Sequence, residues 1–373
     1  MTDMNNAKND NAPKKRVLIA MSGGVDSSAA ARVLMDQGLE CEGVTMRLYR
    51  DESITDNGKS CCSDRDEDDA AFVCHQLGIP HESLCCTKEF RSCVIQKFID
   101  EYQAGRTPNP CVDCNRFMKF GLLMDYAREK GFDAVATGHY ARVERNEETG
   151  RWQLLKAVNE SKDQSYVLYM LTQEQLSHIL LPLGGRTKDE TRAIAEDAGL
   201  INARKRESQD ICFVPDGDYA AFLMRWAGIR AEEGDILDEK GNAVGRHKGA
   251  VRYTTGQRKG LGFAAGEPVY VTGKDMKANT VTIGPESSLF HNGLEASGVN
   301  WVSVAEPEGP IRVTARTRYH QKEKAALCIP LPGGGIKVIF DEPQRAITPG
   351  QAVVLYDGEL LVCGGTIERV FDE

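Results

Sequence analysis

Short apolar runs and amphipathic stretches alternate along roughly the first 200 residues of the chain. Short apolar runs predict buried strands, and the amphipathic stretches predict helices. The predicted strands are Arg16–Met21, Glu42–Leu48, His81–Leu84 and Asp133–Thr137. The predicted helices are Ser27–Gln37, Asp66–Leu77, Lys88–Tyr102, Arg116–Lys130 and Lys188–Ala198. This alternation predicts an α/β fold, a doubly wound parallel sheet with helices on both faces.

The pattern changes after about residue 205, where helical periodicity fades and β-rich runs alternate with Gly, Pro and Asp turns. The β-rich runs are Pro268–Thr272, Thr280–Ile283, Ile311–Thr317, Gly335–Ile339, Ala352–Tyr356 and Leu360–Thr366. They predict two small β-rich, barrel-like domains. We therefore expect a disordered polar tail (1–15), an α/β domain (16–207), a central β-rich domain (208–288) and a C-terminal β-barrel domain (289–373).

Length and cysteine content limit the class of protein. A chain of 373 residues is long enough for two or three domains. The polar start lacks the apolar core of a signal peptide, and no apolar run approaches the roughly 18 residues of a membrane span. Twelve cysteines in such a chain favour thiols with catalytic or ligand roles over structural disulfides. We expect a cytoplasmic protein without a membrane partner.

Charge is unevenly distributed along the chain. The net charge of −9 argues against nucleic-acid binding. However, residues 245–260 carry five Lys or Arg and no acidic residue, and residues 312–324 carry five against Glu323 alone. Local basic stretches of this kind can bind phosphates on an acidic protein, so an RNA partner is compatible with the composition.

The segment Ser22–Ser28, with the sequence SGGVDSS, follows the first predicted strand and opens the first predicted helix. A glycine turn, serine hydroxyls and a helix N-terminus together form a site for a phosphate-type anion. The segment is not a Walker A loop, because no Lys-Ser/Thr pair follows the glycines. Ligands of parallel sheets bind at the carboxyl ends of the strands, where ATGHY (136–140) also lies.

SGGVDSS resembles the PP-loop of the ATP pyrophosphatases, which adenylate a substrate and release pyrophosphate. Four further segments match one family within that group: Gly105–Asn115 (GRTPNPCVDCN), Ala136–Arg142 (ATGHYAR), Ser208–Pro215 (SQDICFVP) and Tyr253–Gly262 (YTTGQRKGLG). In this order they resemble the bacterial tRNA-specific 2-thiouridylases, which replace O2 of the wobble uridine of tRNA with sulfur. The resemblance covers the chain from Arg16 onward.

The resemblance implies an ATP-binding catalytic domain over residues 16–207, with Mg²⁺ accompanying ATP. Adenylation of the uracil O2 makes chemical sense because it turns a poor leaving group into AMP. The family places the nucleotide on the loop, with Met46 and Gly138 at the adenine and ribose. The implied loop residues are Ala20, Met21, Ser22, Gly23, Gly24, Val25, Asp26 and Ser27. Asp26 would orient the loop or help to hold Mg²⁺.

The resemblance also assigns two catalytic thiols, Cys114 and Cys212. Cys212 would accept a persulfide from a sulfur-relay protein or a cysteine desulfurase. Cys114 would then act as the nucleophile, and a Cys114–Cys212 disulfide would result. A thiol near its usual pKa is only a few per cent thiolate at neutral pH, so such a site must favour the thiolate.

Cys111 is a departure from the family pattern, since many members carry Asp at this position. A thiol is a poorer acid–base group than a carboxylate, which leaves the role of Cys111 open. Cys111, Cys114 and Cys212 together could instead hold an iron–sulfur cluster through three thiolates. We predict no zinc site, because no fourth ligand occurs at a familiar spacing.

The family's tRNA contacts carry over to ten positions. Asn109, Pro110 and Cys111 would line the pocket of the flipped uracil. The remaining implied contacts are His139, Lys162, Asp163, Gln164, Arg318, Tyr319 and Gln351. Two other functions stay open on the residues alone: an amide-forming PP-loop ligase, and an RNA-binding protein in which the nucleotide loop is a relic.

Overall fold

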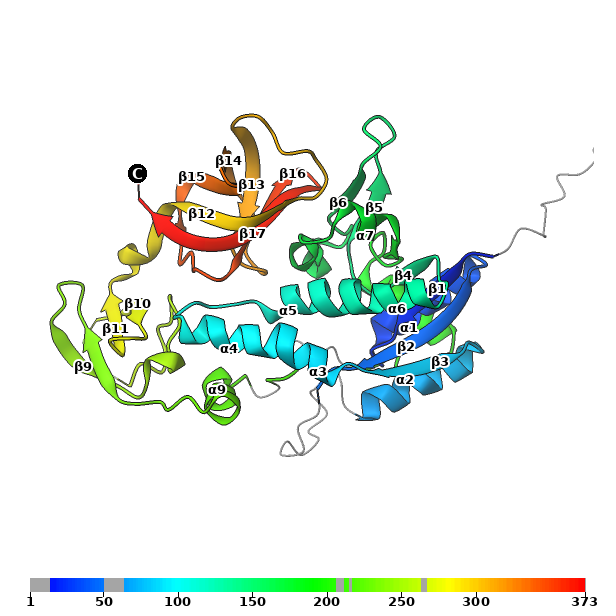
Figure 1. Cartoon of the computed structure of the whole chain (residues 1–373), viewed down its shortest axis with the longest axis horizontal. Coiled ribbons are helices and arrows are strands. Elements are labelled where there is room, and N and C mark those ends of the chain that lie inside the picture. Colours follow the sequence, from blue (N-terminus) through cyan, green and yellow to red (C-terminus); the bar gives the residue numbers. More distant parts are fainter. Residues whose placement is uncertain (1–13, 50–63, 206–210, 215–216, 263–266, 373) are drawn as a thin grey trace, which may run out of the picture.

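The structure is a computed structural model that describes residues 14–49, 64–205, 211–214, 217–262 and 267–372. The predicted tail therefore lies almost wholly outside the described residues, as do Ser208–Asp210 and Pro215. A parallel sheet lies at the right of the view, a small antiparallel-rich sheet formed by residues 234–284 lies at the left, and a barrel lies above this small sheet (Figure 1). No helix within the described ranges is long and apolar enough to cross a membrane.

The first sheet has the strand order β3-β2-β1-β4-β7, and every neighbouring pair is parallel. Its strands are β1 (Arg16–Ala20), β2 (Glu40–Arg47), β3 (His81–Cys85), β4 (Ala134–Ala136) and β7 (Ile179–Leu180). The first four match the strands predicted from the apolar runs, with ends that differ by at most two residues. The α/β prediction is confirmed.

Both faces of this sheet are covered, because successive residues of β1 point to opposite sides. Val17 and Ile19 join the core formed with α1 and α2, whereas Leu18 joins the core formed with α4 and α6. The helices are α1 (Val25–Asp36), α2 (Asp64–Leu77), α3 (Thr87–Phe90), η1 (Arg91–Ile95), α4 (Gln96–Gln103), α5 (Pro110–Asp113), η2 (Cys114–Leu122), α6 (Leu123–Glu129), η3 (Glu160–Lys162), η4 (Ser165–Leu168), α7 (Gln173–Ser177) and α8 (Lys188–Asp197). The sheet is doubly wound, as predicted.

One helical run starts earlier than its periodicity predicts. The run predicted at Arg116 begins with α5 at Pro110, and Asn109 is its N-cap. The Asn109 side chain accepts a hydrogen bond from the Cys111 N–H at 3.1 Å, and proline is favourable in the first turn. Cys111 and Cys114 consequently lie one turn apart on the same helical face.

Within the residues that the structure describes, the central region contains four strands, one α-helix and two short 3₁₀ turns. The strand order is β10-β11-β8-β9, formed by β8 (Gly234–Leu237), β9 (Ala243–His247), β10 (Tyr270–Asp275) and β11 (Thr280–Gly284). The helix α9 (Tyr219–Ala227) is absent from the prediction, which places only β-structure after residue 205. Two of its residues, Phe222 and Leu223, are buried in the core of the α/β domain. The short 3₁₀ turns are η5 (Ala250–Arg252) and η6 (Glu286–Leu289).

The C-terminal region is a closed antiparallel barrel. Its strands are β12 (Phe290–Trp301), β13 (Ile311–Arg316), β14 (Lys324–Leu331), β15 (Gly335–Arg345), β16 (Ala352–Asp357) and β17 (Leu360–Phe371). They follow the order β12-β15-β14-β13-β16-β17, and the pairing of β12 with β17 closes the ring. The predicted barrel is confirmed, although β12 and β14 are absent from the prediction.

The barrel and the α/β domain share a hydrophobic core. Tyr356 and Val354 of β16 are fully buried in the same cluster as Tyr166 and Leu154 of the α/β domain. The hairpin of β5 (Arg142–Arg145) and β6 (Trp152–Leu155) extends the barrel sheet, since Leu155 pairs with Leu360 of β17. The two regions therefore stabilise each other, and the exact domain boundaries stay predictions.

Gly364 of β17 tests this shared packing. A Cβ atom there would lie 2.6 Å from two ring carbons of Tyr169, a residue of the α/β domain. We expect Gly364→Ala to lower the free energy of unfolding by about 1–3 kcal/mol, because the ring must shift in a packed core. The matched control is Gly309→Ala, where an added Cβ meets no atom within 4 Å. Equal urea-unfolding midpoints for the two variants would contradict the shared packing.

Candidate functional site

The loop Ser22–Ser28 is held together by its own hydroxyl groups. The Ser22 N–H donates to Ser27 Oγ at 3.2 Å, and the Ser27 and Ser28 hydroxyls each donate to the Gly24 carbonyl at 3.0 Å. The loop connects the carboxyl end of β1 to the N-terminus of α1. Backbone N–H groups at such a helix start attract anions, as the sequence predicts.

Two glycines let neighbouring segments pack directly against this loop. Gly23 has a φ of +68°, and an added Cβ would lie 2.2 Å from the Asp66 carbonyl oxygen. An added Cβ at Gly138 would lie 2.7 Å from the Asp26 carbonyl carbon and 2.8 Å from the Ser27 nitrogen. Gly138 therefore borders the loop, as its predicted place near the nucleotide requires.

Asp26 is oriented by Tyr140 and Lys188, two residues that lie far from it in the sequence. Lys188 Nζ lies 2.7 and 2.9 Å from the two Asp26 carboxylate oxygens. The Tyr140 hydroxyl donates to the same carboxylate at 2.8 Å and also to Thr191 Oγ1 at 3.0 Å. Sequence reasoning missed Lys188, whose only local signal is the capping box that starts α8 at Thr187. A buried ammonium thus stands beside a loop that lacks the Walker lysine.

A second cation, Lys205, binds the loop through the Gly23 carbonyl. The Gly23 carbonyl accepts hydrogen bonds from Asn202 Nδ2 at 3.0 Å and from Lys205 Nζ at 3.2 Å. Lys205 also forms ion pairs of 2.6 Å with Asp66 and Asp69 of α2. Burial by itself lowers the pKa of Lys205, but the two carboxylates outweigh burial and raise the pKa. Lys205 therefore stays charged beside the loop.

Three of the predicted nucleotide residues have buried apolar side chains. Met21 and Val25 are 2% and 3% exposed, and Met46, on β2, is 9% exposed. The Met21 carbonyl accepts a hydrogen bond from the Thr45 hydroxyl at 3.0 Å, so this residue is held by the sheet. Contact between the nucleotide and Met46 stays a prediction.

The segment that carries Cys111 and Cys114 is held in place by the buried carboxylate of Asp113. Cys111 is exposed on α5 and Cys114 is half-buried at the start of η2. Between them, Asp113 forms an ion pair of 2.6 Å with Lys97 of α4. Burial raises the pKa of Asp113, and Lys97 acts in the opposite direction. Asn115 Nδ2 further ties η2 to the Val167 carbonyl at 3.0 Å.

The second thiol segment is anchored by an aromatic residue. Phe213 is 1% exposed, and its ring centroid lies 5.8, 5.3 and 5.1 Å from those of Phe90, Phe98 and Phe222. Such aromatic contacts stabilise a segment beyond the area that they bury. The neighbouring Cys212 is half-buried, and both Cys212 and Cys114 pack against the same hydrophobic core as thiols.

Two predicted tRNA contacts meet near Cys111. Gln164 Oε1 accepts a hydrogen bond from the Tyr140 N–H at 3.0 Å, and the Gln164 amide also hydrogen-bonds Tyr319. Burial raises the pKa of Tyr319 to about 12, and the negative charges of Asp163 and Cys111 add to the effect. The barrel thereby supplies a neutral phenol within electrostatic range of Cys111.

Other predicted contacts have side chains that bond within the protein. Arg318 donates to the Ala346 carbonyl and to the Thr348 hydroxyl, each at 2.9 Å. Gln351 Nε2 donates to the Thr107 carbonyl at 2.7 Å, which holds the segment before Asn109 and Pro110 against the barrel. Lys162 is half-buried at the end of η3. Direct contact of these residues with tRNA stays a prediction.

A metal cluster does not fit the thiols as they are placed. Within the described ranges, no three His, Cys, Asp or Glu side chains are arranged to hold a metal ion. Cys111, Cys114 and Cys212 all belong to those ranges. They do not form the three-thiolate ligand set of an iron–sulfur cluster, and we assign no reaction step to one.

Three family profiles match this chain in succession. They are described as a tRNA methyl transferase HUP domain (residues 15–216), a tRNA methyl transferase PRC-barrel domain (221–285) and an aminomethyltransferase beta-barrel domain (291–367). The first profile alone covers more than half of the chain.

Curated relatives match over nearly the full length. The tRNA-specific 2-thiouridylase MnmA of Acetivibrio thermocellus is 46% identical and aligns with 95% of this chain and 99% of its own. The tRNA-specific 2-thiouridylase MnmA 1 of Caldanaerobacter subterraneus subsp. tengcongensis is 49% identical, with 95% and 98% aligned. A solved 4-thiouridine synthetase–RNA complex with bound ATP is 19% identical with a TM-score of 0.35, and the match covers 54% of this chain and 45% of that one.

His139 gives a pH-dependent test of the site's geometry. Its ring is buried, and Nδ1 hydrogen-bonds the Thr137 hydroxyl at 2.7 Å. Burial, followed by the nearby Lys119, lowers the pKa of His139 well below its ordinary 6.5. The ring is therefore neutral when folded, and the unfolded chain takes up a proton first as the pH falls. Stability present above pH 6.5 is lost below it.

We expect acidification from about pH 7.5 to about pH 5.5 to cost the natural chain about 1.4 kcal/mol more unfolding free energy than His139→Gln. Urea unfolding at both pH values measures the difference. His75→Gln serves as the control, since His75 is exposed on α2. A loss on acidification that is the same with and without His139 would contradict a buried neutral imidazole.

Proposed function

The chain belongs to the tRNA-specific 2-thiouridylases, and from that premise we propose that it converts the wobble uridine of tRNA to 2-thiouridine with consumption of ATP. The family profiles match all three regions of the chain, and the first of them spans both thiol segments. The observation that carries the proposal is the packing of Cys114 and Cys212 against one core, on a domain whose anion loop supplies the nucleotide site. We place the reaction in the cytoplasm.

The first step is adenylation. The uracil O2 attacks the α-phosphorus of ATP, an O2–P bond forms, and the bond to pyrophosphate breaks. The N–H groups of Ser22–Ser28 and the start of α1 would bind the phosphates, with Mg²⁺ accompanying ATP. Asp26 is paired with Lys188 and Tyr140, which supports the orienting role for its carboxylate. Lys188 would offset the charge that Asp26 brings to an anion site.

The second step is sulfur transfer. Cys212 carries the outer sulfur as a persulfide, donated by a sulfur-relay protein or a cysteine desulfurase. The Cys114 thiolate attacks the inner sulfur, a Cys114–Cys212 disulfide forms, and the outer sulfur leaves as hydrosulfide with the electron pair. Hydrosulfide adds to C2 and AMP departs with O2, which leaves 2-thiouridine. An external thiol must then reduce the disulfide before the next turnover.

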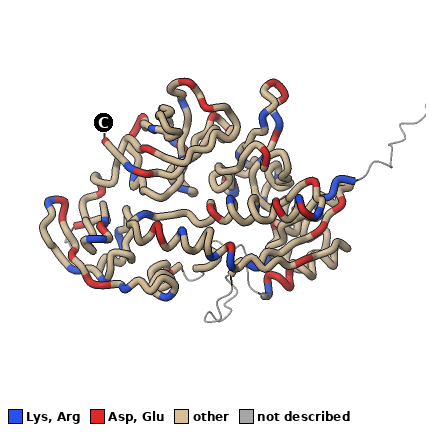
Figure 2. Tube along the Cα trace, viewed as in Figure 1, with Lys and Arg blue, Asp and Glu red and all other residues tan. Residues whose placement is uncertain are grey.

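The tRNA would extend from the catalytic domain over the central region. Arg258 and Lys259 are exposed in the YTTGQRKGLG segment, and Lys248 and Arg252 are exposed close to them in sequence. Figure 2 shows Lys and Arg of this region, at the left of the view, interspersed with Asp and Glu. Phosphate contacts from such side chains position RNA without reading its sequence.

Cysteine substitutions test the sulfur-transfer route. We expect Cys114→Ser and Cys212→Ser to abolish 2-thiouridine formation, because serine can carry no persulfide. Cys111→Ser should keep much of the activity, as an exposed residue outside the exchanging pair. The measurement is nucleoside mass spectrometry of tRNA incubated with ATP, Mg²⁺ and a persulfide donor, together with quantification of AMP and pyrophosphate.

Equal loss of activity in all three variants, with iron bound in the natural chain, would favour the cluster route instead. Stoichiometric ADP and phosphate would contradict adenylation. Thiolation by Cys212→Ser at the natural rate would show that Cys212 does not carry the persulfide.

Basic residues of the central region can be tested separately by salt dependence. We expect Arg258→Ala/Lys259→Ala to weaken tRNA binding and to reduce the slope of log affinity against log salt by roughly one unit per lost phosphate contact. Lys14→Ala/Lys15→Ala is the control, because it removes two exposed charges from the amino end of the parallel sheet. Identical slopes for the two double variants would assign Arg258 and Lys259 to an ordinary solvated surface.

A further inference from the structure

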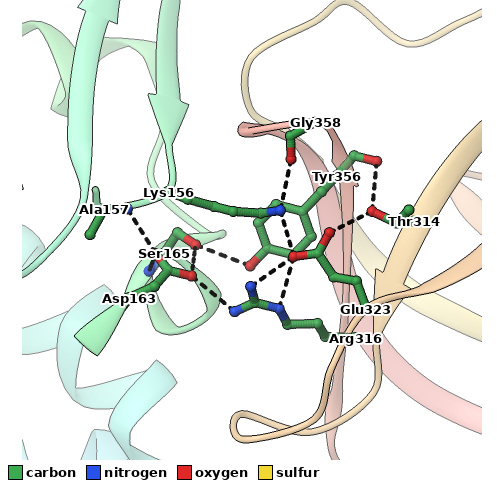
Figure 3. A network of polar contacts seen from close by, with 9 residues as sticks. All are labelled: Lys156, Ala157, Asp163, Ser165, Thr314, Arg316, Glu323, Tyr356 and Gly358. Carbon is green, nitrogen blue, oxygen red and sulfur yellow. Dashed lines mark hydrogen bonds and ion pairs between the residues drawn. The ribbon is translucent and has the colours of Figure 1, made fainter. Parts of the chain in front are cut away.

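Four charged side chains form a network where the α/β domain meets the barrel (Figure 3). Arg316 of β13 lies 2.9 Å from Asp163 of the α/β domain and 2.7 Å from Glu323 of the barrel. Lys156, just after β6, lies 2.5 Å from the same Glu323 carboxylate and donates to the Gly358 carbonyl at 2.7 Å. Two cations and two anions therefore alternate across the junction, with no net charge.

Asp163 is buried with every acceptor site filled, and the other three members of the network are half-buried. The Asp163 side chain is 1% exposed, and that of Arg316 is 13% exposed. Asp163 Oδ1 accepts from the Ala157 and Ser165 N–H groups at 3.1 Å each, and Oδ2 accepts from the Ser165 hydroxyl at 2.9 Å and from Arg316. A carboxylate offers about four acceptor sites. None is left for a ribose hydroxyl or a base, and its negative charge would repel a phosphate.

The two residues of the Asp163–Arg316 ion pair are close in sequence to Gln164 and Tyr319, which hydrogen-bond each other. Asp163 immediately precedes Gln164, and Arg316 precedes Tyr319 by three residues. The Gln164 amide joins the two elements, because it hydrogen-bonds Tyr319 while its oxygen accepts from the Tyr140 N–H. Tyr140 in turn bonds Asp26 in the nucleotide loop. A continuous series of contacts thus runs from the barrel to the loop.

We propose that the Asp163–Arg316 ion pair is a positioning device, which holds Gln164 of the catalytic domain against Tyr319 of the barrel, and that the Asp163 side chain acts inside the protein rather than on tRNA. This inference rests on the proposed function. A buried ion pair of this kind fixes direction as well as distance, because both oxygens of Asp163 have assigned donors. The pair sets the geometry beside Cys111 and leaves tRNA affinity to other residues.

The test compares kcat with tRNA binding in the full-length chain. We expect Asp163→Asn and Arg316→Gln each to lower kcat for thiolation by about tenfold or more, with the tRNA Kd within about threefold of the natural chain. Arg316→Lys should recover part of kcat, because it keeps the charge. The control is Asp341→Asn, which breaks the exposed Arg312–Asp341 pair between β13 and β15 and should change neither quantity.

A second readout does not depend on turnover. Iodoacetamide labelling of Cys111, followed by mass spectrometry, reports how closely Tyr319 is held beside that exposed thiol. We expect faster labelling in Asp163→Asn and Arg316→Gln, and the natural rate in Asp341→Asn. If the natural chain makes no 2-thiouridine, the proposed function fails while the labelling rates still decide the positioning.

Two results would overturn the positioning role. The first is a raised tRNA Kd with an unchanged kcat in Asp163→Asn, which would make Asp163 an RNA contact. The second comes from Tyr319→Phe, which removes the hydroxyl that Gln164 binds without disturbing the buried charges and so serves if the charge variants do not fold. Natural kcat and natural Cys111 labelling in Tyr319→Phe would show that the contact with Gln164 positions nothing.

Discussion

The hydrophobic core shared by the α/β domain and the barrel is the constraint on which the site depends. Tyr356 of the barrel is fully buried against the α/β domain, and Tyr166 donates from that domain to the Ala352 carbonyl at 2.8 Å. Burial of this size fixes the two regions relative to each other. The barrel can therefore contribute Tyr319 to a site whose other groups lie on the parallel sheet and its helices. The shared core also argues that a chain truncated near residue 205 would not fold independently.

Local patterns predicted the parts of the structure whose cause is local. The strand β1 and the turn at Gly23 and Gly24 follow from an apolar run and from glycine geometry, and both are where the sequence predicts them. The helix α9 and the strand β12 are absent from the prediction, because α9 is short and mostly apolar and β12 contains Gly293, Gly298 and two asparagines. Tertiary burial and closure of the barrel form these elements, and neither leaves a periodic signal.

The same reasoning explains what the motifs missed at the site. The loop motif locates Asp26, yet its partner Lys188 is 162 residues away and begins an ordinary capped helix. An aspartate inside an anion site is unfavourable on its own, since it repels the phosphates that the loop N–H groups attract. The Lys188 ammonium removes that conflict at 2.7 Å and needs no place in the motif. Only the fold brings the compensating charge to the loop.

Two of the residues predicted to contact tRNA, Arg318 and Gln351, form hydrogen bonds between regions of this protein. Arg318 donates to the Thr255 carbonyl of the central region at 3.4 Å, and Gln351 donates to the Thr107 carbonyl, just before the Cys111 helix, at 2.7 Å. Burial, followed by the neighbouring Arg345, lowers the pKa of Arg318 from its ordinary value, whereas the carbonyl oxygens to which it donates favour the charged form. Under the proposed function, we expect the surface offered to tRNA around Cys111 to depend on how these regions pack.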